Sequence, residues 1–293
     1  MVTSKMGQVT LELSNRLHAA VERMPAFPKS VQRILELTRD INCEPKDLVA
    51  VIQTDPVIAI KVLKVVNSSY YSLTSKITSI NQSVVYLGLN TIKNLALNFS
   101  VMGMLPQQNA ARFDIQQYLM HSLLTANIAR RLITEFAAGE AEPNDGYIAG
   151  LLHDFGKVVF AQFLPQEFLQ ATILASDGQI SDYLAEEQII GADHAYVGAL
   201  LTKRWEFPAS MVECIRDHHH GYGNCALAEC LYLADIIAKQ MSMDDAENIN
   251  QALIDEALPQ RFGNEIDAVL EALGDQSELM HEAEMFCSGA AFK

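Results

Sequence analysis

The second half of the chain contains an ordered series of histidine and aspartate residues that could bind a divalent metal ion. Imidazole nitrogens and carboxylate oxygens are common ligands of Fe, Mn, Ni and Zn, and an open coordination position on such an ion can activate water for hydrolysis. Six of the eight histidines fall between positions 121 and 220. The candidate ligands are His121, His153, Asp154, His194, His218, His219 and Asp235. These ligand types suit several divalent metals and leave the identity of the ion open.

The adjacent pair His153-Asp154 is the strongest part of this series. It lies within residues 147–159, an almost wholly apolar segment that we expect to form one buried helix. Burying a carboxylate costs free energy unless a cation or hydrogen bonds compensate it. Lys157 lies on the same side of such a helix, where it could hold a substrate phosphate or neutralise Asp154. Two interpretations are therefore open, a metal site and a structural His–Asp–Lys network without metal.

The other candidate ligands lie on segments that we also expect to be helical. Asp193 is placed to cap a helix that begins at His194, and a further helix precedes the three histidines at 218–220. Histidines at a helix end can bind metal or be merely exposed, and the first two of the run are the better candidates. Asp235 lies in the apolar segment 231–237 and is a second carboxylate that needs a partner.

The hydrophobic pattern predicts an all-α protein. Its period is close to 3.6 residues along the chain, and no alternating stretch is long enough to indicate a sheet. Asp55-Pro56 is typical of a helix start, and we expect Asn90 to cap another helix. A polar interruption at 106–109 suggests a domain boundary. We therefore predict an N-terminal multi-helix subdomain (1–108), a helical bundle that holds the candidate ligands (109–240) and a C-terminal helical extension (241–293).

Composition and charge exclude several other classes of protein. The formal net charge of -15 argues against direct nucleic-acid binding, which needs clustered lysine and arginine. The N-terminus lacks a signal-peptide pattern, and the apolar stretch 57–66 is interrupted by two lysines. We therefore expect a cytoplasmic protein that does not bind membranes. Five cysteines without a CxxC pair indicate reduced thiols rather than a disulfide framework.

Four sequence segments resemble the HDOD (HD-related output domain) family. They are MPAFP at 24–28, VLKVVNSSYY at 62–71, SINQSVVYLG at 79–88 and AGLLHDFGK at 149–157. The resemblance extends from about Met24 to at least His220. It implies an all-α fold related to the HD superfamily of metal-dependent phosphohydrolases, with an HD-domain-like helical bundle at 109–240. It also implies a bacterial signalling or regulatory role.

The resemblance also assigns positions within the site. It makes His121 the first histidine of the family pattern, His153-Asp154 the HD pair, and His194 the next histidine. His218 and His219 match the paired histidines, and Asp235 matches the final aspartate. The run His218-His219-His220-Gly221-Tyr222-Gly223-Asn224 lacks the glutamate and the DGxGYP motif that follow the paired histidines of HD-GYP phosphodiesterases. Hydrolysis of cyclic dinucleotides is therefore not the expected activity.

Two functions follow from these observations. The first is signalling through protein–protein contacts, in which the N-terminal helices and the loop at 67–71 bind a partner such as a response regulator or a nucleotide-messenger enzyme. The alternative is metal-dependent hydrolysis of a nucleotide or another phosphate-containing small molecule. In that case Asp154 and Lys157 would be catalytic, with Lys157 contacting the substrate phosphate.

Overall fold

The computed structural model describes residues 10–39, 44–71, 73, 75–106, 110–176, 178, 180–220, 225–241, 260–263 and 266–290. Within these ranges the chain forms α-helices and short 3-10 helices and no β-strand, which confirms the predicted all-α class. No helix in the described ranges is both long and apolar enough to cross a membrane. Residues 221–224, which are part of the run that differs from HD-GYP proteins, lie outside the described residues. The same is true of residues 242–259 of the predicted C-terminal extension.

The chain divides into two compact units. The first combines Met1–Met24 with Pro106–Ala283, and the second combines Pro25–Leu105 with Glu284–Lys293. Helix α1 (Leu11–Arg23) belongs to the first unit because it packs against α9 and α12, although the sequence-based division placed it in the segment 1–108. The guanidinium of Arg204, the last residue of α12, stabilises this packing by donating hydrogen bonds to the backbone carbonyls of Glu22 and Met24.

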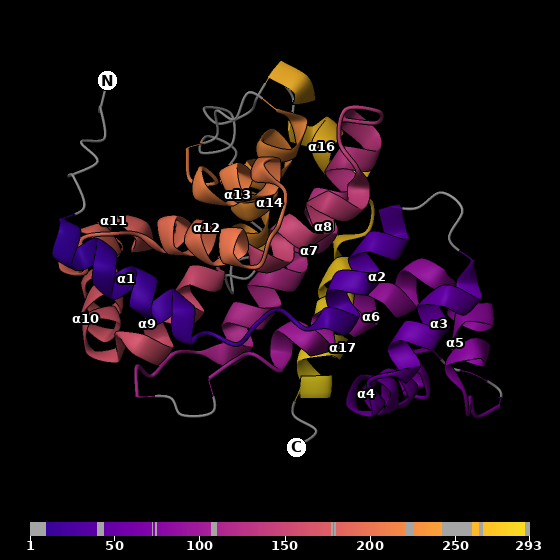
Figure 1. Ribbon diagram of the computed structural model, residues 1–293. Coiled ribbons are helices and arrows are strands. Elements are labelled where there is room, and N and C mark those ends of the chain that lie inside the picture. The colour runs from indigo at the N-terminus through magenta and orange to yellow at the C-terminus, as the bar shows by residue number, and fades with distance from the viewer. Residues whose placement is uncertain are drawn as a thin grey trace. The chain divides into compact units, whose positions relative to one another are not determined.

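The second unit is a group of short helices formed mainly by the N-terminal third of the chain (Figure 1). Its helices are α2 (Lys29–Arg39), α3 (Pro45–Gln53), α4 (Pro56–Val66), η1 (Ser69–Tyr71), α5 (Ile80–Leu87) and α6 (Leu89–Met102). Asp55 caps α4 by accepting from two backbone amides at 3.1 Å, as its position before a proline predicted. The predicted Asn90 cap is wrong, because α6 begins one residue before it and Gly88 occupies the N-cap with φ 82°.

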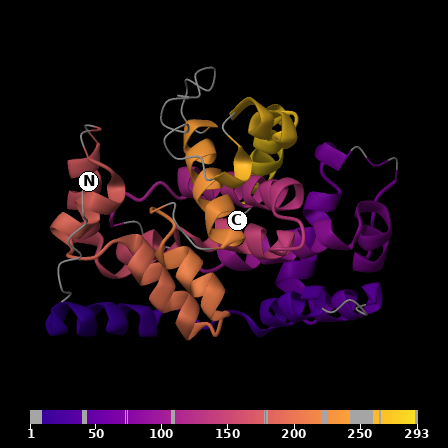
Figure 2. The ribbon, with the colours of Figure 1, turned by 90° about the horizontal axis from the view of Figure 1, so that it is seen from above.

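The first unit is built around the long helix α7 (Ile115–Phe136), which packs against α8, α14 and α16 (Figure 1). Helices α12 and α13 form a second packed pair, drawn in orange in Figure 2. The other elements are α8 (Pro143–Leu152), α9 (Phe155–Phe163), α10 (Pro165–Ala175), α11 (Asp182–Ile189), α12 (His194–Arg204), α13 (Ala209–Arg216), α14 (Ala226–Met241), η2 (Gln260–Phe262) and α16 (Ile266–Leu273). Helix α17 (Gln276–Ala290) contributes residues to both units.

The apolar segment 147–159 forms two helices, so the prediction of one continuous helix was wrong. Helix α8 ends at Leu152 and α9 begins at Phe155, with His153 and Asp154 at the junction. His153 keeps helical angles, whereas Asp154 has φ −91° and ψ 5°. The backbone turns at Asp154, and this turn directs its carboxylate toward several ring nitrogens. Hydrophobic periodicity is uniform along the segment and does not reveal the turn.

Gly150 allows the backbones of α7 and α8 to approach closely just before this junction. A Cβ atom at Gly150 would lie 2.5 Å from backbone atoms of Ala126, closer than any ordinary contact. The same glycine accepts a hydrogen bond of 2.8 Å at its carbonyl from Nδ1 of His153. The close packing of α8 on α7 therefore also fixes the ring of the first residue of the His–Asp pair.

Candidate metal centre

The structure brings all seven predicted ligands together within the first unit. Five separate parts of the fold supply them: α7, the α8–α9 junction, the start of α12, the turn after α13, and α14. In chain order these residues are His121, His153, Asp154, His194, His218, His219 and Asp235. Six of them are buried and His219 is partly exposed. A buried cluster of this composition satisfies the first requirement of a metal centre.

One group of ligand atoms is formed by His121, His153 and Asp235. The two Nε2 atoms lie 3.1 Å apart, and Oδ1 of Asp235 lies 3.1 Å from His121 and 3.4 Å from His153. All three ligand atoms are within 4.8 Å of one another, a spacing that one ion can bridge. The second carboxylate oxygen of Asp235 accepts from Nζ of Lys239 at 2.6 Å.

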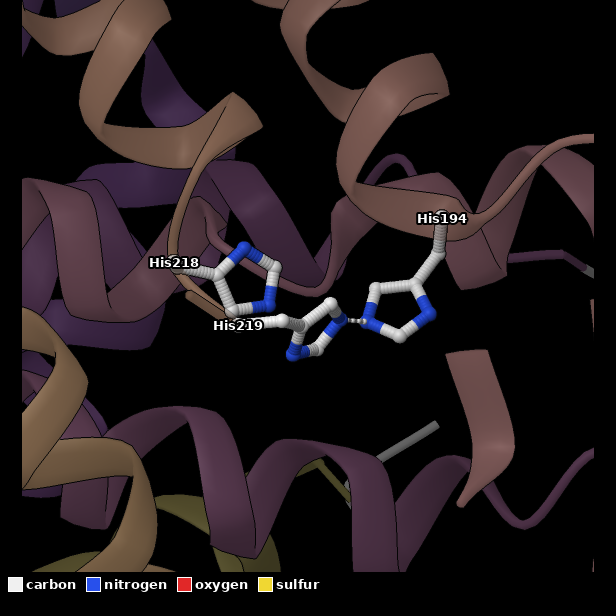
Figure 3. Close-up of side chains that lie close together, drawn as sticks. All are labelled: His194, His218 and His219. Carbon is white, nitrogen blue, oxygen red and sulfur yellow. Dashed lines mark hydrogen bonds between the residues drawn. The ribbon is translucent and has the colours of Figure 1, made fainter. Parts of the chain in front are cut away.

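Asp154 connects this group to a second one. Its Oδ1 lies 2.9 Å from Nε2 of His194, 3.4 Å from His153 and 3.6 Å from His218. The second group consists of His194, His218 and His219, whose ring nitrogens also lie within 4.8 Å of one another. Figure 3 shows these three rings converging, with Nε2 of His219 at 2.9 Å from Nε2 of His194. Asp154 is thus at the centre of the cluster.

Backbone carbonyls orient two of the rings. Nδ1–H of His153 donates to Gly150, and Nδ1–H of His218 donates to the carbonyl of Ile215 at 2.6 Å. These hydrogen bonds leave the Nε2 lone pairs directed toward the carboxylates. Such an arrangement, in which the far ring nitrogen is held by a protein acceptor, is typical of histidines that bind a metal.

Burial keeps most of these imidazoles neutral at neutral pH. Burial lowers the pKa of His218 to about 4 and lowers the pKa of His121 and His219 below the usual value. Burial opposes ionisation of Asp154, but His153 and the ammonium of Lys157 outweigh it and hold the Asp154 pKa well below its usual range. Neutral imidazoles around an ionised carboxylate are the protonation states that a divalent cation requires.

The cluster also contains buried polar atoms that lack a hydrogen bond of favourable geometry. Within the described part of the chain these include Oδ1 of Asp154, Nε2 of His218 and Oδ1 of Asp235. Oδ1 of Asp154 lies 2.9 Å from His194 and 3.6 Å from His218, and Oδ1 of Asp235 lies 3.1 Å from His121. Buried acceptor atoms that converge with few donors among them are costly unless a cation lies between them. The residues present therefore fit a divalent metal.

Beside the cluster lies a cavity of about 570 Å³. Asp154, His194, His219 and Lys157 line it, so ligand atoms and an ammonium share one open space. Lys157 donates to Asp154 at 2.9 Å and lies 3.3 Å from a carboxylate oxygen of Asp182. Aromatic rings contribute to the walls, where Tyr183 stacks on His219 with ring centres 4.4 Å apart. The space is large enough for a phosphate ester.

Glu186 is part of the site and was missed by sequence reasoning. Its side chain is 2% exposed, and Oε2 lies 2.6 Å from Nδ1 of His194. Asp182 and Tyr183 of the same helix, α11, were missed as well. Nothing in the sequence separates Glu186 from its neighbour Glu187, because only tertiary packing buries the first of them. His220, the least favoured of the three histidines, belongs to neither group of ligand atoms.

This fold and site define an all-α protein with a histidine–aspartate cluster suited to a divalent metal. Residues 24–221 match the HDOD domain, and the chain belongs to the HDOD family. A curated relative, an uncharacterised protein of Treponema pallidum (strain Nichols), is 26% identical over 223 residues, which cover 75% of this chain. The matched region represents 43% of the length of that relative.

Two solved structures share the fold. One is a protein of Shewanella amazonensis SB2B, provisionally assigned as a phosphohydrolase, with a TM-score of 0.71 and 23% identity, and the match covers 92% of this chain and 98% of that one. The other is a protein of Marinobacter aquaeolei VT8, provisionally assigned to signal transduction, with a TM-score of 0.73 and 24% identity. That match covers 98% of this chain and 68% of the other. At these identities the likenesses establish the fold.

Proposed function

We propose that this protein is a metal-dependent phosphohydrolase that acts on a phosphate ester. The observation that carries the proposal is the central position of Asp154. Its carboxylate lies within 3.6 Å of ring nitrogens of four histidines, beside a cavity that also contains Lys157. A purely structural network of these residues would not need to line a cavity, whereas a catalytic site must be open to its substrate. The family match supports the proposal because HDOD domains resemble HD-superfamily phosphohydrolases.

The residues divide into two roles under this proposal. The seven ligands would hold one or two divalent ions, which supply a water of lowered pKa and polarise a phosphoryl oxygen. Lys157 positions the substrate, because its ammonium lies at the cavity wall beside Asp154 and can pair with a phosphate oxygen. His153 and Asp154 are buried, so bulk water would have little access to the ligand atoms of these two residues.

The proposal is tested by metal content and hydrolysis together. Untagged protein is analysed by elemental mass spectrometry beside Asp154→Ala, His153→Ala and the control His220→Ala. We expect wild type and H220A to contain about equal metal, and both other variants to lose most of it. Hydrolysis of p-nitrophenyl phosphate and bis(p-nitrophenyl) phosphate should follow metal content. A folded wild-type protein that remains without metal after exposure to Fe, Mn, Ni and Zn would contradict the proposal.

A second candidate function is signalling through contacts with a partner protein. Specific observations in the second unit favour it: Val57 and Ile60 of α4 and Val85 and Tyr86 of α5 are more than half exposed. Helices α4 and α5 pack on one another, so both bring apolar side chains to the surface of the same small unit. Exposed apolar groups of this size often mark protein–protein contacts. The loop with Tyr70, predicted to take part, belongs to this unit.

Affinity capture with a charged double variant tests the second candidate. Val85→Glu combined with Tyr86→Glu should abolish capture of a partner from the native host. Ile173→Glu is the matched control, because Ile173 is 62% exposed but lies in the other unit. If the partners captured by wild type, the double variant and the control are the same, these helices do not form the contact surface.

A further inference from the structure

Helix α11 contacts the candidate metal centre through one short stretch of sequence. Asp182 approaches Lys157, Tyr183 stacks on His219, and Glu186 reaches His194. Tyr183 and Glu186 are three positions apart, so one face of the helix meets both His219 and His194. This helix supplies none of the seven ligands. Its contacts are made to the groups that would bind metal and substrate.

Glu186 makes the closest of these contacts. Its Oε2 accepts from the backbone N–H of His194 at 2.7 Å and from Nδ1–H of the same residue at 2.6 Å. Two hydrogen bonds to one residue fix both the start of α12 and the rotation of the imidazole ring. Asp193 supports the same turn by capping α12 through the amide of Tyr196 at 2.7 Å.

A buried carboxylate is costly unless it has a strong partner. The Glu186 side chain is 2% exposed and forms part of the cavity wall. Within the described residues its Oε1 has no hydrogen-bond partner. The adjacent Glu187 is only partly buried. The fold therefore buries one specific carboxylate of the pair, and its hydrogen bonds are directed to a single candidate ligand.

We propose that Glu186 is a positioning residue that holds His194 in the orientation needed to bind metal. The inference rests on the proposed metal-dependent function. By accepting from Nδ1–H, Glu186 leaves Nε2 directed at Asp154, at 2.9 Å. His153 and His218 have neutral carbonyl acceptors in the same position, whereas His194 has a carboxylate. A carboxylate acceptor makes the ring a stronger ligand, so His194 is the ligand most dependent on its partner.

The test compares Glu186→Ala and Glu186→Gln with the control Glu187→Ala. Zinc affinity is measured by competition with a chelator, after circular dichroism has shown that each variant is folded. We expect E186A to bind Zn²⁺ about 10- to 100-fold more weakly than wild type, the range seen when such partners are removed. E187A should stay within about 2-fold. E186Q keeps the side-chain volume and an acceptor oxygen but lacks the charge, so its affinity should lie between those of E186A and wild type. If packing were the only role of Glu186, E186Q would bind Zn²⁺ as tightly as wild type. Equal affinity in wild type and E186A would overturn the inference.

A second readout separates this inference from the proposed function. Histidine labelled with ¹⁵N reports the Nδ1–H resonance of His194, which a hydrogen bond to a carboxylate protects from exchange with water. The resonance should be present in wild type and E187A and lost in E186A, with or without zinc. If wild type binds no zinc, the proposed function fails, while this resonance still decides whether Glu186 positions His194. Its absence from wild type would overturn the inference.

Discussion

The backbones of Gly156 and His194 touch, and this contact joins α9 to the start of α12. A Cβ atom at Gly156 would overlap the carbonyl oxygen of His194 and lie 2.8 Å from its Cα. Gly156 follows Asp154 by two residues, so the contact brings the His–Asp junction and His194 to the same place. Oδ1 of Asp154 and Nε2 of His194 can therefore lie 2.9 Å apart only because Gly156 has no side chain.

Replacing Gly156 with alanine should therefore disturb both stability and the metal centre. We expect G156A to lower the free energy of unfolding by about 1–3 kcal/mol or more, because backbone atoms have to move apart. Metal content should fall in the folded fraction, since His194 moves away from Asp154. Urea unfolding and elemental analysis measure the two effects.

Gly198→Ala is the control for this change. Gly198 is also helical and lies in α12, but its nearest neighbour would be a side-chain atom of Ile215 at 3.3 Å. A small shift of that side chain would accommodate the methyl group. If G156A and G198A are equally stable and both keep metal, the close contact does not determine the geometry of the site.

The ligand set could be predicted from the sequence because its members are unusual where they occur. His153, Asp154 and Asp235 interrupt apolar segments, and a buried charge needs a partner wherever the chain folds. Local rules also predicted the start of α12, where Asp193 caps the helix that begins at His194. These inferences depend on a few neighbouring residues and do not require knowledge of the tertiary structure.

Glu186 and the turn at Asp154 could not be predicted in this way. Glu186 lies beside Glu187 in a polar helix, and the contact with His194 exists only after α11 and α12 pack together. The turn at Asp154 occurs within an apolar segment whose pattern fits one helix. Its backbone angles place the carboxylate among rings from other helices, and tertiary contacts outweigh local helix propensity there.

Asn67, in the HDOD-like segment 62–71, has a structural role. Its side-chain amide donates to the carbonyls of Leu63 and Ile77, and its Oδ1 accepts from the amide of Ile77, each at 2.8 Å. These bonds tie the end of α4 to the segment before α5. Asn67→Ala should lower the free energy of unfolding by about 2–3 kcal/mol, because three hydrogen bonds of roughly 1 kcal/mol are lost.

Asn90→Ala provides the comparison for this variant, because Asn90 is exposed on α6 and should tolerate the change within about 0.5 kcal/mol. Denaturant unfolding of both variants gives the difference directly. Metal content should be unchanged in N67A, since Asn67 lies in the unit that does not contain the ligands. Equal stability of the two variants would show that the Asn67 bonds are not formed in solution.

The stability of metal-free protein should fall as pH rises above neutrality. Burial lowers the pKa of His194, but Glu186 and Asp154 outweigh burial and raise it to about 9 from an ordinary value of 6.5. Folding therefore favours the protonated ring. The resulting stabilisation is fully present below about pH 6.5 and is lost as pH rises through about 9. Urea unfolding of EDTA-treated protein from pH 6 to 9.5 measures this loss.

Glu186→Gln removes the charge that raises the His194 pKa and should flatten this pH profile. Glu187→Gln, an equal change of charge at the next position, should leave the slope near that of wild type. A wild-type profile that is already flat, or one that rises between pH 7 and 9, would mean that His194 is neutral in the folded, metal-free protein.

Arg112 is expected to contribute to substrate binding at the edge of the cavity. It is an exposed residue that lines the cavity, and its backbone has φ 53°, a conformation that is uncommon for residues other than glycine. The other two cations that line this cavity in the described residues, Lys157 and Lys239, are paired with carboxylates at 2.9 and 2.6 Å. Among the described residues no carboxylate forms an ion pair with the Arg112 guanidinium, which can therefore meet an anionic substrate group.

Arg112→Gln should raise KM for p-nitrophenyl phosphate by about 2- to 5-fold, the effect of one exposed charge contact, and leave kcat nearly unchanged. The effect should shrink at high salt, because exposed charges are screened. Arg33→Gln in α2 is the control for a general change in charge, since Arg33 pairs with Glu36 in the other unit. A fall in kcat at constant KM in R112Q would instead place the Arg112 guanidinium at the reacting phosphate, because a group that stabilises only the transition state changes kcat without changing substrate binding.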